Sequence, residues 1–91
     1  MTRISIQDLV WDEWNTKHIK KHRISQQEVA VAGKQIIFHK HSRSGRYIAF
    51  GRSGERLLAI ILSRKDRKTY YVVTARDASK KERMKINEKE K

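Results

Sequence analysis

Four short segments rich in β-branched and aromatic residues follow one another in the later part of the chain, and they limit the fold more than any other feature. They span residues 35–39, 46–52, 56–64 and 69–75, and short turns rich in Lys, Arg, Ser and Gly separate them. Runs of this composition between turn residues are typical of strands. Because the connections are so short, consecutive segments should pair with each other. The pattern predicts a four-stranded antiparallel meander.

Helical segments flank this sheet in the sequence. Asp12 is a suitable N-cap for a helix over residues 13–22. Ser25 and Glu28 form a capping box for a second short helix, which Gly33 can stop.

The end of the chain carries a third helix signal, and its beginning carries a weak strand signal. Ser79 and Glu82 form a capping box for a helix over about residues 79–87, and residues 84–91 are expected to fray. Residues 9–11 can add a short strand. The whole order predicts one α+β domain over residues 1–91, with two N-terminal helices, a sheet and a C-terminal helix. We expect the helices on one face of the sheet and the apolar strand 56–64 at its centre.

The charge of the chain indicates a polyanionic partner. Lysine and arginine total 22 against 10 acidic residues, for a formal net charge of +12. Such an excess suits nucleic acid, an acidic protein or a membrane surface. The sequence has no apolar run long enough for a membrane span and no visible signal peptide. It has no cysteine, which excludes disulfides and thiolate metal sites. We expect a cytoplasmic protein without a cofactor.

Arg76 lies at the most informative position. It closes the last β-rich segment and precedes the Ser79 capping box by three residues. It therefore lies at a strand-to-helix junction, beside a helix N-terminus, where a phosphate group can bind. The planar guanidinium fork binds phosphate with two bonds and keeps its charge at all relevant pH values.

Several motifs together resemble BrnT toxins. They are Val-Trp-Asp-Glu at 10–13, Lys-His-Arg-Ile-Ser at 21–25, Gly-Arg-Ser at 51–53, and Thr-Ala-Arg-Asp-Ala-Ser-Lys-Lys-Glu-Arg at 74–83. The resemblance covers roughly residues 9–85, and the closing motif is its most specific part. In this family a glycine usually stands where this chain has Arg23. The segment 34–45 is also more basic here than in the family.

The resemblance implies a RelE-like fold and the toxin of a type II toxin–antitoxin system. Such toxins cut RNA, in some cases on the ribosome, and so stop translation. The implied partner is a small BrnA-like antitoxin, expected to have a ribbon-helix-helix fold and to form an oligomeric complex with the toxin. None of this follows from composition.

Three arginines match basic positions of the family pattern and are the predicted phosphate-binding residues: Arg46, Arg52 and Arg76. Strand alternation places Arg46 and Arg52 on one face, about 20 Å apart along their strand. The same alternation places Tyr70, Val72, Thr74 and Arg76 together, so the two sets can flank one surface of the sheet.

Proton transfer and RNA contact are assigned to polar residues of segments 39–47 and 70–71. His39 and His41 titrate near neutrality and could act as base or acid. An alternative is that both are only polar residues of an edge strand. Tyr47, Tyr70 or Tyr71 could stack a base or donate a proton. The residues predicted to contact RNA are Lys40, Arg43, Tyr47 and Tyr70.

The first helix carries no comparable chemistry. His18 and His22 have the spacing of a helical metal pair, but no third ligand follows at a matching distance, so we predict no metal site. Trp11 and Trp14 are expected to anchor this helix to the sheet. A non-catalytic nucleic-acid-binding module, or an inactive toxin that acts only in an autoregulatory complex, remains an alternative to the ribonuclease.

Overall fold

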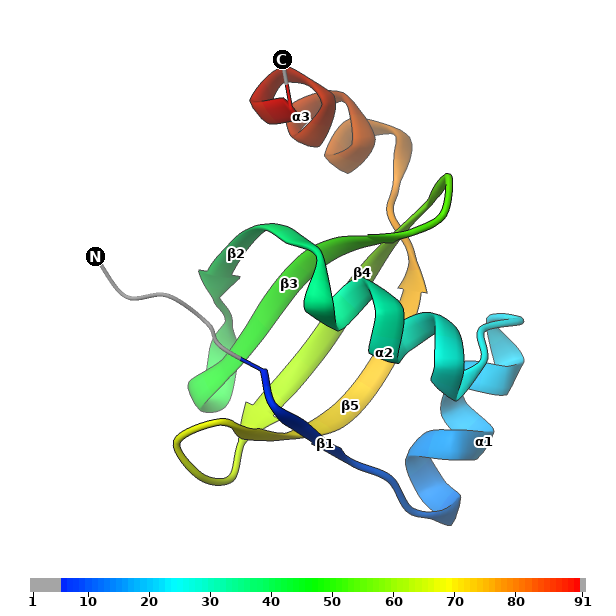
Figure 1. Cartoon of the computed structure of the whole chain (residues 1–91), viewed down its shortest axis with the longest axis vertical. Coiled ribbons are helices and arrows are strands. Elements are labelled where there is room, and N and C mark those ends of the chain that lie inside the picture. Colours follow the sequence, from blue (N-terminus) through cyan, green and yellow to red (C-terminus); the bar gives the residue numbers. More distant parts are fainter. Residues whose placement is uncertain (1–5, 91) are drawn as a thin grey trace.

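The computed structural model describes residues 6–90 and has the predicted α+β architecture (Figure 1). The elements in chain order are β1 (Asp8–Val10), α1 (Glu13–Lys21), α2 (Gln26–Lys34), β2 (Ile36–His41), the 3-10 turn η1 (Arg43–Gly45), β3 (Arg46–Ser53), β4 (Arg56–Arg64), β5 (Thr69–Asp77) and α3 (Lys80–Glu90).

The sheet confirms the predicted meander and adds one strand to it. Its order is β1-β5-β4-β3-β2, so β4 is central as expected. Strands β2 to β5 pair antiparallel, and β1 joins the edge of β5 in parallel, with Leu9 opposite Tyr70. The short strand that residues 9–11 could form is therefore present, one residue earlier than expected.

Helices α1 and α2 cover one face of this sheet, called here the α1/α2 face (Figure 1). The main core lies beneath them and includes Ile19, Val29, Leu58 and Ile60, all fully or almost fully buried. Gly51 allows α2 to approach β3 closely, since a Cβ there would lie 2.1 Å from the Ala32 carbonyl oxygen.

Helix α3 lies on the opposite face, so the expectation that all helices cover one face was wrong. This face, called here the α3 face, has a second apolar cluster of Phe50, Leu57 and Ala59, which Ile86 of α3 covers. The central strand is apolar at successive positions, and both of its faces therefore need a cover. Helix α3 continues to Glu90, through most of the segment that was expected to fray.

The predicted caps are present, with small differences at the helix ends. The side chains of Asp12, Ser25 and Ser79 accept hydrogen bonds from the third residue of their helices. Helix α2 runs through Gly33 to Lys34 instead of stopping at Gly33. None of the helices within residues 6–90 is long and apolar enough to span a membrane.

The two tryptophans near α1 have different environments. Trp11 packs against the main core as expected. Trp14 does not anchor α1, because it is 52% exposed and stacks on His18 with ring centroids 4.2 Å apart. The reason is helical geometry: the faces of α1 that hold Asn15 and Ile19 are the buried ones.

Candidate nucleic-acid interface

The α3 face carries all three arginines that were predicted to bind phosphate. Cross-strand register places Arg46, Ser63 and Tyr71 in one row across β3, β4 and β5. The next rows are Ile48, Ile61 and Thr74, then Phe50, Ala59 and Arg76. Directly opposite residues point to the same side of a sheet. Arg46 and Arg76 therefore share this face, two rows apart.

Helix α3 covers only part of the α3 face. Ile86 of α3 belongs to a cluster with Phe50, Leu57 and Ala59, and Ile48 packs at the edge of this cluster, whereas Ile61, Ser63 and Tyr71 are half-exposed. We call this half-exposed part, with Arg46, Ile48 and Thr74, the open half. Thr74 places its Oγ1 there, buried and without a hydrogen-bond partner among the described residues.

Arg76 lies at the boundary between the open half and α3. Its guanidinium makes two hydrogen bonds to the Glu82 carboxylate, at 2.7 and 3.0 Å. The Arg76 bonds, followed by the Ser79 backbone N–H bond at 2.8 Å, lower the pKa of Glu82 to about 2. Glu82, which also accepts a bond from the Ser79 N–H at the start of α3, therefore occupies the guanidinium of Arg76, where phosphate was predicted to bind.

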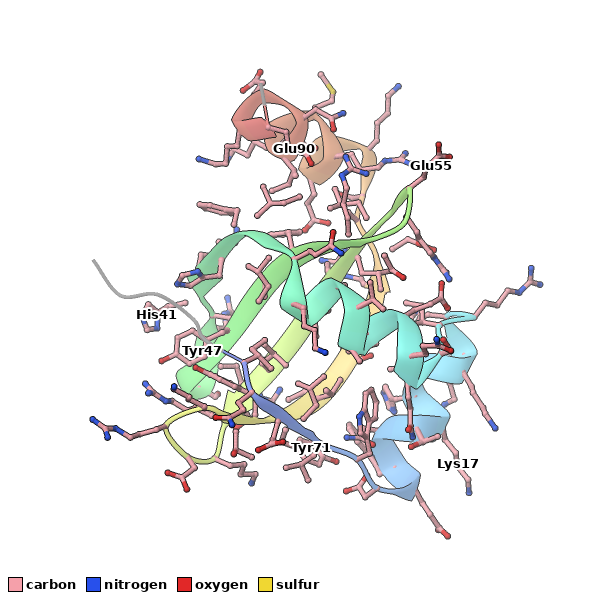
Figure 2. All side chains as sticks on the ribbon, in the orientation of Figure 1. Lys17, His41, Tyr47, Glu55, Tyr71 and Glu90 are labelled. Atoms are coloured by element: carbon pink, nitrogen blue, oxygen red, sulfur yellow. The ribbon has the colours of Figure 1, made fainter. Side chains whose placement is uncertain are left out.

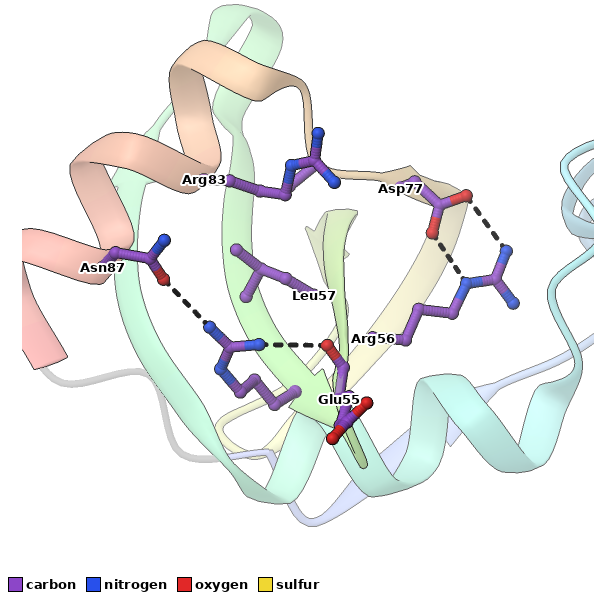
Figure 3. A pocket seen from close by; sticks show the side chains of 8 residues that line it. Glu55, Arg56, Leu57, Asp77, Arg83 and Asn87 are labelled. Atoms are coloured by element: carbon purple, nitrogen blue, oxygen red, sulfur yellow. Dashed lines mark hydrogen bonds and ion pairs between the residues drawn. The ribbon is translucent and has the colours of Figure 1, made fainter.

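Arg52 is held in the same way at the far end of α3. It binds Glu90 at 2.9 and 2.8 Å, Asn87 at 3.1 Å and the Glu55 carbonyl at 3.1 Å. These contacts close one side of a cavity of about 470 Å³ beneath α3 (Figure 3). Arg46 and Arg52 lie at opposite ends of β3, as expected, and only Arg46 borders the open half.

Arg56 lines the same cavity, and its role was not predicted. It binds Asp77 at 2.7 and 3.1 Å (Figure 3) and Glu28 at 2.8 Å. It also donates to the carbonyls of His22 and Arg23 at 3.3 and 2.9 Å. Arg56 thus joins the sheet to the α1–α2 turn. These partners are 21 to 34 residues away from Arg56 in the sequence, so no local motif predicts the role of this arginine.

A bulge in β5 overturns the expected grouping of its side chains. Leu62 pairs with Val72, but Ile61 pairs with Thr74, so Val73 is an extra residue. As a result Tyr70 and Val72 point to the α1/α2 face, and Thr74 and Arg76 point to the α3 face. Tyr70 is 2% exposed, so an RNA base cannot stack on it in this conformation.

The two predicted histidines lie on the α1/α2 face, away from the arginines. Strand β2 continues to His41, so His39 and His41 share a face. His39 pairs with Ala49, a core residue of that face, and the centroids of the His41 and Tyr47 rings are 4.7 Å apart (Figure 2). Tyr47 is half-buried there and meets Tyr70 edge-on.

Tyr71 is the tyrosine that reaches the open half. Its hydroxyl donates to Asp12 Oδ2 at 2.9 Å, which ties β5 to the N-terminus of α1. Desolvation, followed by the bond to Asp12, raises the pKa of Tyr71. The hydroxyl therefore stays protonated at neutral pH and is a potential proton donor.

The predicted RNA contacts Lys40 and Arg43 are both exposed, but they lie in different places. Lys40 pairs with Ile48 on the α3 face and lines a groove with Glu82 and Lys85. Arg43 lies in η1, at the end of the sheet that is far from α3.

Comparison with known proteins identifies the fold. No family model and no curated protein matches the sequence. The structure matches the crystal structure of the Brucella abortus ribonuclease toxin BrnT with a TM-score of 0.64 and 21% sequence identity, over 80% of this chain and 97% of that chain. The chain therefore has a BrnT-like fold, and the resemblance predicted from the sequence is confirmed at that level.

Proposed function

We propose that this protein is the toxin of a type II toxin–antitoxin system. In this proposal it is a metal-independent endoribonuclease that cuts cytoplasmic RNA and thereby inhibits translation. The observation that carries the proposal is the fold, which is shared with a ribonuclease toxin. The charge of +12 supports it, because a polyanionic substrate needs a cationic surface.

The open half offers groups for two of the roles that RNA cleavage requires. Cations must neutralise the scissile phosphate, a base must accept the proton of the 2′-hydroxyl as its oxygen attacks phosphorus, and an acid must protonate the leaving 5′-oxygen. The open half offers groups for the first and the third of these roles. Arg76 and Arg46 are the proposed cations, and Tyr71 is the proposed acid. His39 and His41 lie on the edge strand β2, so they can take part only if RNA wraps around that edge.

The Arg76–Glu82 pair must open for this chemistry. A phosphate group can replace the Glu82 carboxylate, because each of these groups can present two oxygen acceptors to the guanidinium of Arg76. The Arg76 and Glu82 side chains are 37% and 25% exposed, and pairs this accessible contribute only about 0–1 kcal/mol. Exchange of carboxylate for phosphate is therefore energetically accessible.

Cleavage of a labelled mixed-sequence RNA in excess EDTA tests the proposal. We expect products with 2′,3′-cyclic phosphate ends from the wild type and a large loss of rate with Arg76→Ala. Arg76→Lys should recover little, because lysine lacks the fork. Lys20→Ala, on the exposed side of α1, is the control and should cut like the wild type. Cleavage that stops in EDTA, or that Arg76→Ala leaves unchanged, contradicts the proposal.

The proposed partner is a BrnA-like antitoxin that covers the arginines of the α3 face. A partner for a surface this basic should carry an acidic segment. Co-expression with the product of a neighbouring reading frame should yield a stable complex that does not cut RNA. An antitoxin without an acidic stretch would count against this part of the proposal.

The placement of the histidines favours one alternative, a nucleic-acid-binding module without catalysis. Within residues 6–90 the α3 face presents arginines, Lys40 and Tyr71 but neither of the predicted histidines. Tight, salt-sensitive RNA binding without cleavage, on and off the ribosome, would support this alternative.

A further inference from the structure

A second group of cations lies at the end of the sheet opposite to α3. In an antiparallel meander the β2–β3 and β4–β5 connections lie at the same end of the sheet, and the β3–β4 connection lies at the other. The pairing of Arg46 with Ser63 and of Arg64 with Tyr70 confirms this placement. We call the six exposed cations in these two connections and at the adjoining strand ends the basic end: Arg43, Arg46, Arg64, Lys65, Arg67 and Lys68.

The six cations of the basic end outnumber the acidic residues near them. Nearby carboxylates are those of Asp66, in the same turn, and Asp8, opposite Thr69 on β1. The ion pairs formed within residues 6–90 involve Arg52, Arg56 and Arg76, and therefore none of the six cations. The carboxylates that pair with these arginines lie on α2, at the end of β5 and on α3, and the cations of the basic end are exposed.

Hydrogen bonds hold the β4–β5 turn in a defined shape. Arg64 donates to the carbonyls of Asp66 and Arg67 at 3.3 and 3.1 Å, and Asp66 Oδ1 accepts from the Arg67 N–H at 2.7 Å. The carbonyl of Lys68 accepts from the N–H groups of Gln7 and Asp8 at 2.9 and 3.1 Å. Less conformational entropy is therefore lost when this turn binds a ligand.

The chemistry of the basic end suits a nucleic-acid backbone better than a folded protein. A protein interface usually has an apolar core inside a polar rim. The exposed large apolar residues within residues 6–90 are Val10, Trp14 and Met84, and none belongs to either turn. Exposed cations without an apolar centre are the usual surface for phosphate contacts that carry no sequence information.

We infer that the basic end is a docking surface for the phosphate backbone of RNA. This surface is separate from Arg76, which lies at the boundary between the open half and α3. The two turns are two strand spacings apart, about 10 Å, so one RNA strand can cross both. From there the RNA strand can continue along Arg46 and Tyr71 into the open half. This inference rests on the proposed function for its choice of RNA, and it assigns the β4–β5 turn a role in holding substrate.

The test uses RNA that cannot be cut, so that binding is measured apart from catalysis. A labelled mixed-sequence RNA with every 2′-hydroxyl methylated is titrated with full-length protein between about 50 and 200 mM salt. The variant Arg43→Gln/Arg67→Gln/Lys68→Gln removes three cations from the basic end. The control Lys17→Gln/Lys20→Gln/Lys21→Gln removes the same charge from the exposed side of α1. Thermal melts establish that both variants fold.

We expect the basic-end variant to lower the slope of log Kd against log salt by about 2, since each lost phosphate contact contributes about 0.7 for single strands. The control should lower it by less than half as much. Equal slopes in the two variants would overturn the inference, because net charge alone would then explain binding. An unchanged slope together with weakened antitoxin binding would also overturn it. If the methylated RNA gives the expected slopes but the wild type does not cut ordinary RNA, the docking surface stands and only the proposed ribonuclease activity is overturned.

Discussion

Replacing Arg23 by glycine should stabilise the protein. Arg23 follows α1 with a φ of 59°. Its N–H and that of Ile24 donate to the carbonyls of Lys20 and Ile19 at 2.9 and 3.0 Å, which is the Schellman pattern. A left-handed backbone costs an L-residue about 1–2 kcal/mol, and the greater freedom of glycine in the unfolded chain costs about 0.4–1 kcal/mol. The net gain should be about 0.5–1 kcal/mol.

Thermal and urea unfolding of three proteins measures this gain: the wild type, Arg23→Gly and Arg23→Ala. The alanine variant loses the same guanidinium but keeps a Cβ, so it should gain nothing. The Arg23 carbonyl that binds Arg56 is present in all three. A gain of this size raises the Tm by about 2–8 °C for a chain of this length. Equal stability of the glycine and alanine variants would refute the assignment of strain to the left-handed backbone.

Three other substitutions test the packing and the ion pairs. Gly51→Ala should cost about 3 kcal/mol or more in urea unfolding, because the new Cβ would lie 2.1 Å from the Ala32 carbonyl oxygen; Gly33→Ala, whose Cβ would meet nothing closer than 3.8 Å, should be neutral or stabilising. The Glu82 pKa of about 2 lies below its ordinary 4.5, so the stability from its pairing with Arg76 is present above that ordinary value and is lost as the pH falls toward 2. The stability difference between wild type and Glu82→Gln, about 1 kcal/mol after solvent screening, should therefore vanish in acid, and a difference that stays constant with pH would contradict it. Arg56→Met should cost about 2 kcal/mol, because two carboxylates and two carbonyls lose their donor; unfolding at an unchanged urea midpoint would show that these bonds contribute nothing.

The features that the sequence predicts well are local. Each cap needs two residues three positions apart, so Ser25 with Glu28 and Ser79 with Glu82 can be recognised without any knowledge of the fold. The meander follows in the same way from short turns between strands. The central place of β4 follows from its continuous apolar residues, since a strand covered on both faces needs no alternation.

The features that the sequence does not predict depend on contacts between distant residues. The bulge at Val73 reverses the face to which the preceding side chains of β5 point, yet no glycine or proline in the sequence indicates it. The side of the sheet that α3 takes depends on one buried residue, Ile86, in a helix of charged residues. The sequence also does not predict the ion-pair partners of Arg52 and Arg76, because any carboxylate of this chain could pair with an arginine.

The parallel pairing of β1 with β5 has a consequence for when the protein folds. Strand β1 completes the sheet by pairing with β5, and the Tyr71 hydroxyl donates to Asp12 across the same edge. Contacts this distant in sequence form late, because the intervening loop must close first. During synthesis, β1 and the N-terminus of α1 therefore wait for β5 to leave the ribosome. A chain that stops before Thr69 should remain sensitive to proteases in the segments that form β1 and α1.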